Sequence, residues 1–133
     1  MHEAQEVAVL ASERGFTRLG ILGTRYLMEG PVYRSKLSLR TIGHESPRPR
    51  ERSEIDRIIF EELVYGRFEE AARESVRNII GGLAKRGCDA VVLGCTEIPL
   101  LISEADSPLP ALDSTRMLAR AALREATQGA AEP

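Results

Sequence analysis

The residues with the clearest chemical potential are Cys95, Thr96 and Glu97, which follow the apolar run Asp89–Leu93 and a glycine. A short apolar run, opened by the turn-like Arg86-Gly87-Cys88, predicts a strand that is buried on both faces, as in a parallel sheet. Functional groups in open α/β sheets lie just past the carboxyl ends of such strands. A thiol at this position is a candidate for chemistry, and a small cysteine that fills space beside a turn is the alternative.

The surroundings of Cys95 predict a reactive thiol. A helical segment begins near Ile98, and its dipole and free amide groups favour thiolate over thiol, so we expect a lowered pKa. Cys88 cannot share this role, because it lies at the opposite end of the same strand. Six extended residues of about 3.3 Å each separate the two cysteines by roughly 20 Å. A disulfide needs Cα atoms within ~7 Å, so we expect two free thiols.

Other polar residues are weaker candidates. Thr24 follows the apolar segment Leu19–Gly23, where its hydroxyl and backbone amide suit a carboxylate, although a simple helix cap is an equally good interpretation. His44 follows a predicted strand and could reach a site at the carboxyl edge of the sheet, yet a lone loop histidine is more often solvated. The arginine-rich run 48–52 is interrupted by proline and acid, which indicates a solvated loop. The glycine spacing of dinucleotide-binding proteins is absent, and no Cys/His cluster predicts a metal site.

The elements that must position these residues alternate between helix and strand. We expect strands near residues 18, 40, 90 and 110, a pattern that predicts an α/β lobe of flavodoxin-like type with a four-stranded parallel sheet flanked by helices. The predicted strands comprise residues 19–24, 39–43, 89–93 and 109–112. The predicted helices comprise residues 3–14, 31–39, 53–66, 69–85, 98–103 and 115–127, and residues 128–133 are expected to fray. The alternative for the second helix is a start nearer Leu27 with a bend at Pro31.

Two local features qualify this pattern. Residues 44–52 are expected to form a mobile loop at a strand end, and Ser53-x-x-Asp56 predicts a loose capping box at the start of the next helix. Gly81 and Gly82 interrupt a helix at a cost of roughly 1 kcal/mol each relative to alanine. This cost is tolerable if a neighbouring backbone approaches the helix closely at that point.

Composition limits the classes of function. The 133 residues are 43% apolar, enough for a single domain over residues 1–133 with its own core. Since 18 basic and 20 acidic residues are mixed along the chain, no basic surface predicts a nucleic-acid partner. No apolar run approaches the ~20 residues of a membrane span, and the N-terminus lacks the regions of a signal peptide. We therefore expect a cytoplasmic protein.

Three segments together resemble the second lobe of the aspartate/glutamate racemase family: Leu93–Pro99, Gly20–Thr24 and Asp113–Thr115. The segment Ile58–Gly66 is similar to the aspartate racemase branch. Glutamate racemases usually carry a histidine after Cys-Thr, where this chain has Glu97. The resemblance extends from about His2 to Ala126 and argues against a space-filling Cys95.

The resemblance implies a racemase without cofactor or metal, in which two similar lobes hold a small acidic amino acid such as aspartate. One cysteine from each lobe acts on opposite faces of the α-carbon, and donors directed at the carboxylate stabilise the carbanion-like state. Carried over by position, Cys95 is one acid/base residue. Thr24 and Thr96 hold the α-carboxylate or amino group, and Glu97 orients local groups.

The resemblance also implies a second lobe with its own cysteine, and the sequence begins about where that lobe ends. The chain is then a fragment, pairs with another chain, or forms a homodimer in which two copies of Cys95 face each other. An unpaired lobe exposes an apolar face that favours self-association. The alternative function is a non-catalytic carboxylate-binding or interaction module. A flavodoxin-like regulatory domain is disfavoured, since the first strand's end lacks an acidic pocket.

Overall fold

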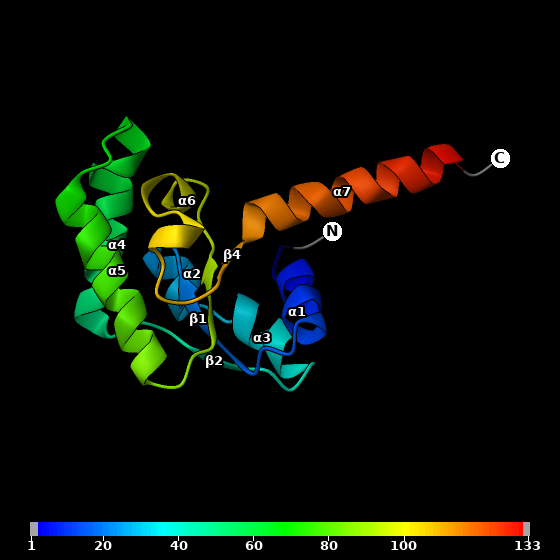
Figure 1. The fold of residues 1–133 in the computed structure, drawn as a ribbon, viewed down its shortest axis with the longest axis horizontal. Helices are drawn as coiled ribbons and strands as arrows, with labels where there is room; N and C mark the ends of the chain where they lie inside the picture. The colour runs from blue at the N-terminus through cyan, green and yellow to red at the C-terminus, as the bar shows by residue number, and fades with distance from the viewer. Residues whose placement is uncertain (1–2, 132–133) are drawn as a thin grey trace.

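The computed structural model, which describes residues 3–131, contains a four-stranded parallel sheet in the order β2-β1-β3-β4. Its strands are β1 (Arg18–Leu22), β2 (Gly43–Glu45), β3 (Ala90–Leu93) and β4 (Ala111–Asp113). Figure 1 shows this sheet between two layers of helices. The predicted fold class is confirmed. All of β3 is buried, as expected for a central strand covered on both faces.

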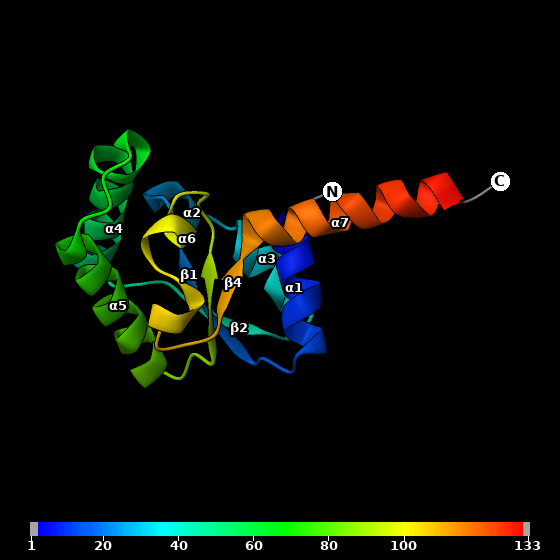
Figure 2. The same cartoon turned by 45° about the horizontal axis from the view of Figure 1, so that its top comes forward.

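Each face of the sheet has its own apolar core. Ala4, Val7, Tyr33 and Leu37 from the helices pack with Leu19 and other residues on one face of the sheet. Figures 1 and 2 show the helices of this layer on one side of the strands, with the start of the last helix crossing the first. The helices of this layer are α1 (Glu3–Glu13), α3 (Val32–Ser38) and α7 (Ser114–Ala131).

The second core is larger. Ile55, Ile58, Ile80 and Leu83 pack against the opposite face of the sheet together with Leu22 and others. Their spacing of three and four residues places them on the inner sides of two long helices. The elements on this side are α4 (Pro49–Glu61), α5 (Glu70–Lys85) and the short α6 (Ile98–Leu101), with η1 (Leu63–Tyr65), η2 (Glu104–Asp106) and α2 (Arg25–Glu29) in the connections.

Asp89 connects the amino-terminal ends of the two central strands, β1 and β3. Its carboxylate accepts hydrogen bonds from the backbone N–H groups of Thr17 (2.8 Å) and Arg18 (3.0 Å) and from the Thr17 hydroxyl (3.1 Å). Burial raises the pKa of this carboxyl, but the hydrogen bonds outweigh that effect and leave the pKa lowered. Asp89 therefore helps to set the register in which Leu22 pairs with Leu93 at the upper end.

The predicted strand at residues 39–43 is wrong. Leu39 is 80% exposed, and the chain makes a tight turn after α3 in which Ile42 N–H donates to Leu37 O. Thr41 has a φ of 60°, a conformation that is incompatible with a strand. The observed strand β2 starts at Gly43 and includes His44, so the expected loop 44–52 contains a strand and the first turn of α4.

The predicted capping box at Ser53-x-x-Asp56 is also wrong, because α4 begins four residues earlier at Pro49. The backbone N–H of Arg48 donates to Glu51 Oε1 at 2.8 Å instead. Asp56 accepts a 2.7 Å hydrogen bond from the backbone N–H of Arg25, the first residue of α2. A side chain predicted to start its own helix therefore stabilises the start of a different one.

Within residues 3–131, no neighbouring backbone approaches the glycine pair of α5, so the condition that would make their cost tolerable is not met. A Cβ added at Gly81 would meet nothing within 4 Å, and one at Gly82 would meet a Glu51 oxygen at 3.9 Å. We therefore expect Gly81→Ala to raise the free energy of unfolding by about 1 kcal/mol, because alanine has the higher helix propensity. Urea denaturation followed by circular dichroism measures this change.

Gly66 offers a matched control for this prediction. It also has open space around its Cβ position, but its φ of +77° is left-handed. Gly66→Ala is therefore expected to lower the free energy of unfolding by about 1 to 2 kcal/mol. A decrease in stability on Gly81→Ala would show that the glycine has a role that its surroundings do not explain.

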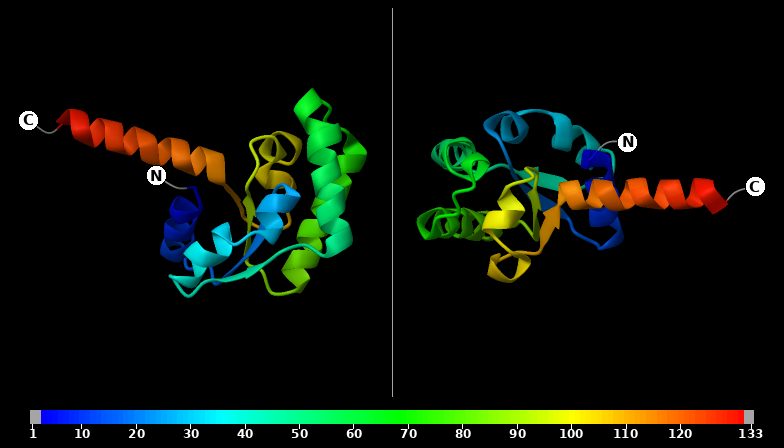
Figure 3. Two further views of the ribbon diagram at one scale, coloured as in Figure 1. Left: turned by 180° about the vertical axis from the view of Figure 1, so that it is seen from behind. Right: turned by 90° about the horizontal axis from the view of Figure 1, so that it is seen from above.

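The last helix is longer than predicted. α7 continues to Ala131, beyond the predicted end at residue 127, and residues 132–133 lie outside the described part of the chain. Both views in Figure 3 show the far half of α7 extending away from the rest of the fold. Among residues 3–131, no helix has the length and apolar character that crossing a membrane requires.

Candidate active site

The candidate site lies where β1 and β3 end side by side. Leu22 pairs with Leu93 in the parallel ladder, and each strand continues through a glycine, Gly23 or Gly94. Thr24 and Cys95 are therefore equivalent positions at the same edge of the sheet. This confirms the predicted placement of Cys95 just past the carboxyl end of a buried strand.

Gly94 allows the close approach of the two strand ends. Its N–H donates to Leu22 O at 2.8 Å. A Cβ at Gly94 would lie 2.3 Å from Cδ2 of Leu27 and 3.0 Å from Leu22 O, and a Cβ at Gly23 would lie 2.5 Å from the same Leu27 atom. The Leu27 side chain therefore packs over both glycines, and any larger residue would displace it.

The thiol of Cys95 donates a hydrogen bond to Glu97 Oε2 at 2.8 Å. Burial raises the pKa of Cys95 to about 11, and the Glu97 carboxylate contributes in the same direction. The backbone N–H groups of Glu97 and Ile98 act in the opposite direction but have smaller effects. The expected lowered pKa is therefore wrong. Helix α6 has four residues, and its dipole does not outweigh desolvation and a neighbouring negative charge.

The same hydrogen bond keeps Glu97 ionised. Hydrogen bonds from Cys95 and from the Thr96 hydroxyl lower the pKa of the Glu97 carboxyl, against a smaller effect of burial. At neutral pH the site therefore holds a protonated thiol beside a carboxylate. The carboxylate fixes the direction of the S–H bond, and both groups are half-buried.

Replacing Glu97 with glutamine tests this assignment. We expect the pKa of Cys95 to fall, because the amide removes the negative charge that disfavours the thiolate. Alkylation of Cys95 by iodoacetamide at pH 8 should accelerate by about threefold per unit of pKa decrease, since lower basicity offsets part of the gain in thiolate. Mass spectrometry of the Cys95 peptide measures the rate, with the Cys88 peptide as an internal reference.

The outcome that would contradict this assignment is an unchanged or slower alkylation of Cys95 in Glu97→Gln. Thr96→Val serves as the matched control, because Thr96 is exposed and its hydroxyl reaches Glu97 rather than the thiol. Its effect on the Cys95 rate should be smaller than that of Glu97→Gln.

The remaining predicted residues have different positions. Thr24 is the N-cap of α2, where its hydroxyl oxygen accepts from Leu27 N–H at 3.3 Å. The cap interpretation is therefore confirmed, and the hydroxyl hydrogen remains able to donate to a ligand. His44 lies in β2 and lines a pocket of about 260 Å³ whose lining residues do not include Cys95. Cys88 is a buried free thiol at the other end of β3, and burial raises its pKa.

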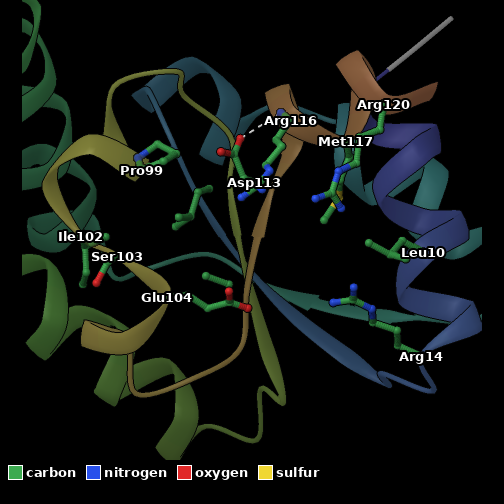
Figure 4. A pocket seen from close by; sticks show the side chains of 12 residues that line it. Leu10, Arg14, Pro99, Ile102, Ser103, Glu104, Asp113, Arg116, Met117 and Arg120 are labelled. Carbon is green, nitrogen blue, oxygen red and sulfur yellow. Dashed lines mark hydrogen bonds between the residues drawn. The ribbon is translucent and has the colours of Figure 1, made fainter. Parts of the chain in front are cut away.

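A second group of polar residues, which was not predicted from the sequence, lies at the β4 edge of the sheet. Arg14, Arg116 and Arg120 line a pocket of about 490 Å³, which Figure 4 shows from close by. The spacing of Arg116 and Arg120 places them on one face of a helix. No sequence pattern connects them to Arg14, which lies in the turn directly after α1.

Solved structures resemble this chain closely. It shares 37% identity and a TM-score of 0.89 with a proposed Asp/Glu racemase from Yersinia pestis, over 95% of this chain and 55% of that one. An aspartate racemase homologue from Pyrococcus horikoshii is 30% identical with a TM-score of 0.86, over 96% of this chain and 56% of that one. The aspartate racemase of Picrophilus torridus is 26% identical with a TM-score of 0.76, over 96% of this chain and 52% of that one.

The chain spans about half the length of these structures. The similarity to each of them covers 95% or 96% of this chain. A family model of Asp/Glu/hydantoin racemases matches residues 2–122, which contain all of the predicted site residues. This chain belongs to the Asp/Glu/hydantoin racemase family.

Proposed function

We propose that this chain supplies one lobe of a cofactor-independent amino-acid racemase that acts on aspartate or a similar acidic amino acid. The observation that carries the proposal is the 2.8 Å hydrogen bond between the Cys95 thiol and Glu97 at the carboxyl edge of the sheet. Family membership and the similarity to an aspartate racemase support the reaction type.

In this proposal, Cys95 transfers a proton at one face of the substrate's α-carbon. A pKa of about 11 keeps Cys95 protonated at neutral pH, so its resting role is that of the acid. The S–H bond breaks as the proton moves to the carbanionic α-carbon, and the thiolate that remains removes a proton when the reaction runs in reverse. Glu97 orients the S–H bond, which holds the proton in a fixed direction.

The substrate's carboxylate needs hydrogen-bond donors, because the carbanion-like state is stabilised by delocalising charge into that group. Thr96 is exposed beside Cys95, and Thr24 follows the neighbouring strand at the equivalent position. We assign both to the α-carboxylate or amino group. The distance between these strand ends is set by the Gly94–Leu22 hydrogen bond.

The opposite face of the α-carbon requires a second acid/base group. We propose that another lobe supplies it, either from an additional polypeptide segment or from a second copy of this chain. The family resemblance supports the first source, since the relatives are about twice as long. Two copies of Cys95 facing each other would provide the same chemistry by symmetry.

Incubation of the purified chain with L-aspartate and D-aspartate in deuterium oxide tests the proposal. Proton NMR follows loss of the α-proton, and chiral chromatography follows configuration. Exchange with racemisation would show a two-base site made from two copies, and exchange with retention would show a single working base. The assignment of substrate would be overturned if the folded chain neither exchanged the α-proton of either enantiomer nor bound either enantiomer.

A non-catalytic carboxylate-binding module is the second candidate. The raised pKa of Cys95 favours it, because a thiol that remains protonated is compatible with binding alone. This function predicts that aspartate binds without any deuterium exchange. Isothermal titration calorimetry beside the NMR experiment separates the two functions.

A further inference from the structure

The pocket at the β4 edge is a separate hollow in the surface. It lies between the end of α1, the first turns of α7 and the segment around Ile102 to Glu104 (Figure 4). Its volume of about 490 Å³ falls within the ordinary range for small-molecule sites. The pocket includes Leu93 and Pro99, which flank the segment bearing Cys95, but the thiol is not among its lining residues.

Three guanidinium groups face this hollow from one side. Arg14 is in the turn directly after α1, and Arg116 and Arg120 come from successive turns of α7. Within residues 3–131, none of these three forms an ion pair with a carboxylate, whereas Arg57 and Arg77 on the other side of the sheet each form two. Unpaired guanidinium groups in one pocket are suited to bidentate contacts with carboxylate or phosphate oxygens.

The backbone adds to the positive potential. Arg116 and Met117, in the first turn of the 18-residue helix α7, line the pocket, and the positive end of that helix's dipole favours an anion. Asp113 Oδ1 accepts a hydrogen bond from the Arg116 backbone N–H at 3.1 Å, so this carboxylate interacts with the start of α7. Leu10 and Met117 provide apolar walls between the charged groups.

Glu104 lies on the opposite wall, and Figure 4 shows it across the hollow from Arg14. Its carboxylate would repel an anionic group placed beside it, but it can accept from a hydroxyl or ammonium group. The charges on the two walls therefore fix the orientation of a bound ligand. Anionic groups belong at the α1–α7 wall, and a hydrogen-bond donor belongs at the Glu104 wall.

We propose that this pocket binds a small multivalent anion, with two or more carboxylate or phosphate groups held by Arg14, Arg116 and Arg120 and a hydroxyl or ammonium group facing Glu104. This site is distinct from the Cys95 site. The proposal does not depend on racemase activity, because its ligand is held by different residues from different elements.

Isothermal titration calorimetry with citrate tests the proposal, since citrate carries three carboxylates and one hydroxyl. Pyrophosphate is titrated in parallel, and the tighter of the two anions assigns the pocket to carboxylates or to phosphates. Arg116→Gln and Arg120→Gln are each expected to weaken binding by about tenfold, because each removes a charge-assisted contact. Glu104→Gln is expected to tighten binding, because it removes a negative charge and keeps an acceptor.

Arg40→Gln is the matched control. It removes the same charge from an exposed arginine near the end of α3, and binding should change by less than about twofold through general electrostatics. Absence of citrate and pyrophosphate binding in the wild type would overturn the proposal. An equal loss in Arg40→Gln and in the pocket variants would overturn it as well. Circular dichroism verifies that each variant is folded.

Discussion

Replacing Cys95 with alanine is expected to slow deuterium exchange at the α-carbon of aspartate by about 10²- to 10⁴-fold, the range that one positioned acid/base group contributes. The methyl group of alanine neither donates nor accepts a proton. The fold should survive, because Cys95 is half-buried at the margin of the larger core rather than at its centre. Proton NMR in deuterium oxide measures the rate for wild type and variant at equal concentrations of folded protein.

Cys88→Ala is the control for this experiment. Cys88 is the other free thiol, it is 5% exposed, and it lies at the opposite end of β3. Its loss should leave the exchange rate per folded molecule unchanged. Retention of wild-type exchange in Cys95→Ala would remove Cys95 from the proposed mechanism, whereas loss in both variants would indicate a general effect of packing.

The largest expected effect on stability comes from Leu83→Ala. Leu83 is fully buried in the larger core, where it packs against Gly20 so closely that a Cβ there would lie 2.7 Å from Leu83 Cδ1. Truncation leaves a cavity beside a backbone that has no side chain to fill it. We expect a loss of about 2 to 5 kcal/mol in the free energy of unfolding. Urea denaturation with linear extrapolation measures the loss.

Leu39→Ala provides the matched comparison, because it removes the same atoms from a side chain that is 80% exposed. Its effect should stay within about 0.5 kcal/mol. A cost for Leu83→Ala as small as that for Leu39→Ala would mean that α5 and β1 repack around the cavity. The role assigned to the contact between Leu83 and Gly20 would then be wrong.

Local pattern predicted most elements where side-chain periodicity was strong. The run Ala90–Leu93 and the stripe in α5 were both recognisable, because burial on one or both faces leaves a clear apolar spacing. The wrong strand and the wrong capping box both fell within residues 39–56, where the apolar spacing was weak. There Asp56 caps α2 by accepting from the backbone N–H of Arg25, which is 31 residues away in the chain. Such contacts leave no local signal.

The sequence by itself determined the fold class and the position of Cys95 at a strand end, because a buried strand followed by glycine is a local property of the chain. The tertiary structure decided how the thiol ionises. Desolvation by packed neighbours raises its pKa, and so does the Glu97 carboxylate, whose contact with the thiol depends on the folded turn and not on its nearness in sequence alone. The tertiary structure also brought Arg14 to the same pocket as Arg116 and Arg120, because α1 and α7 are far apart in the chain and pack together only in the fold.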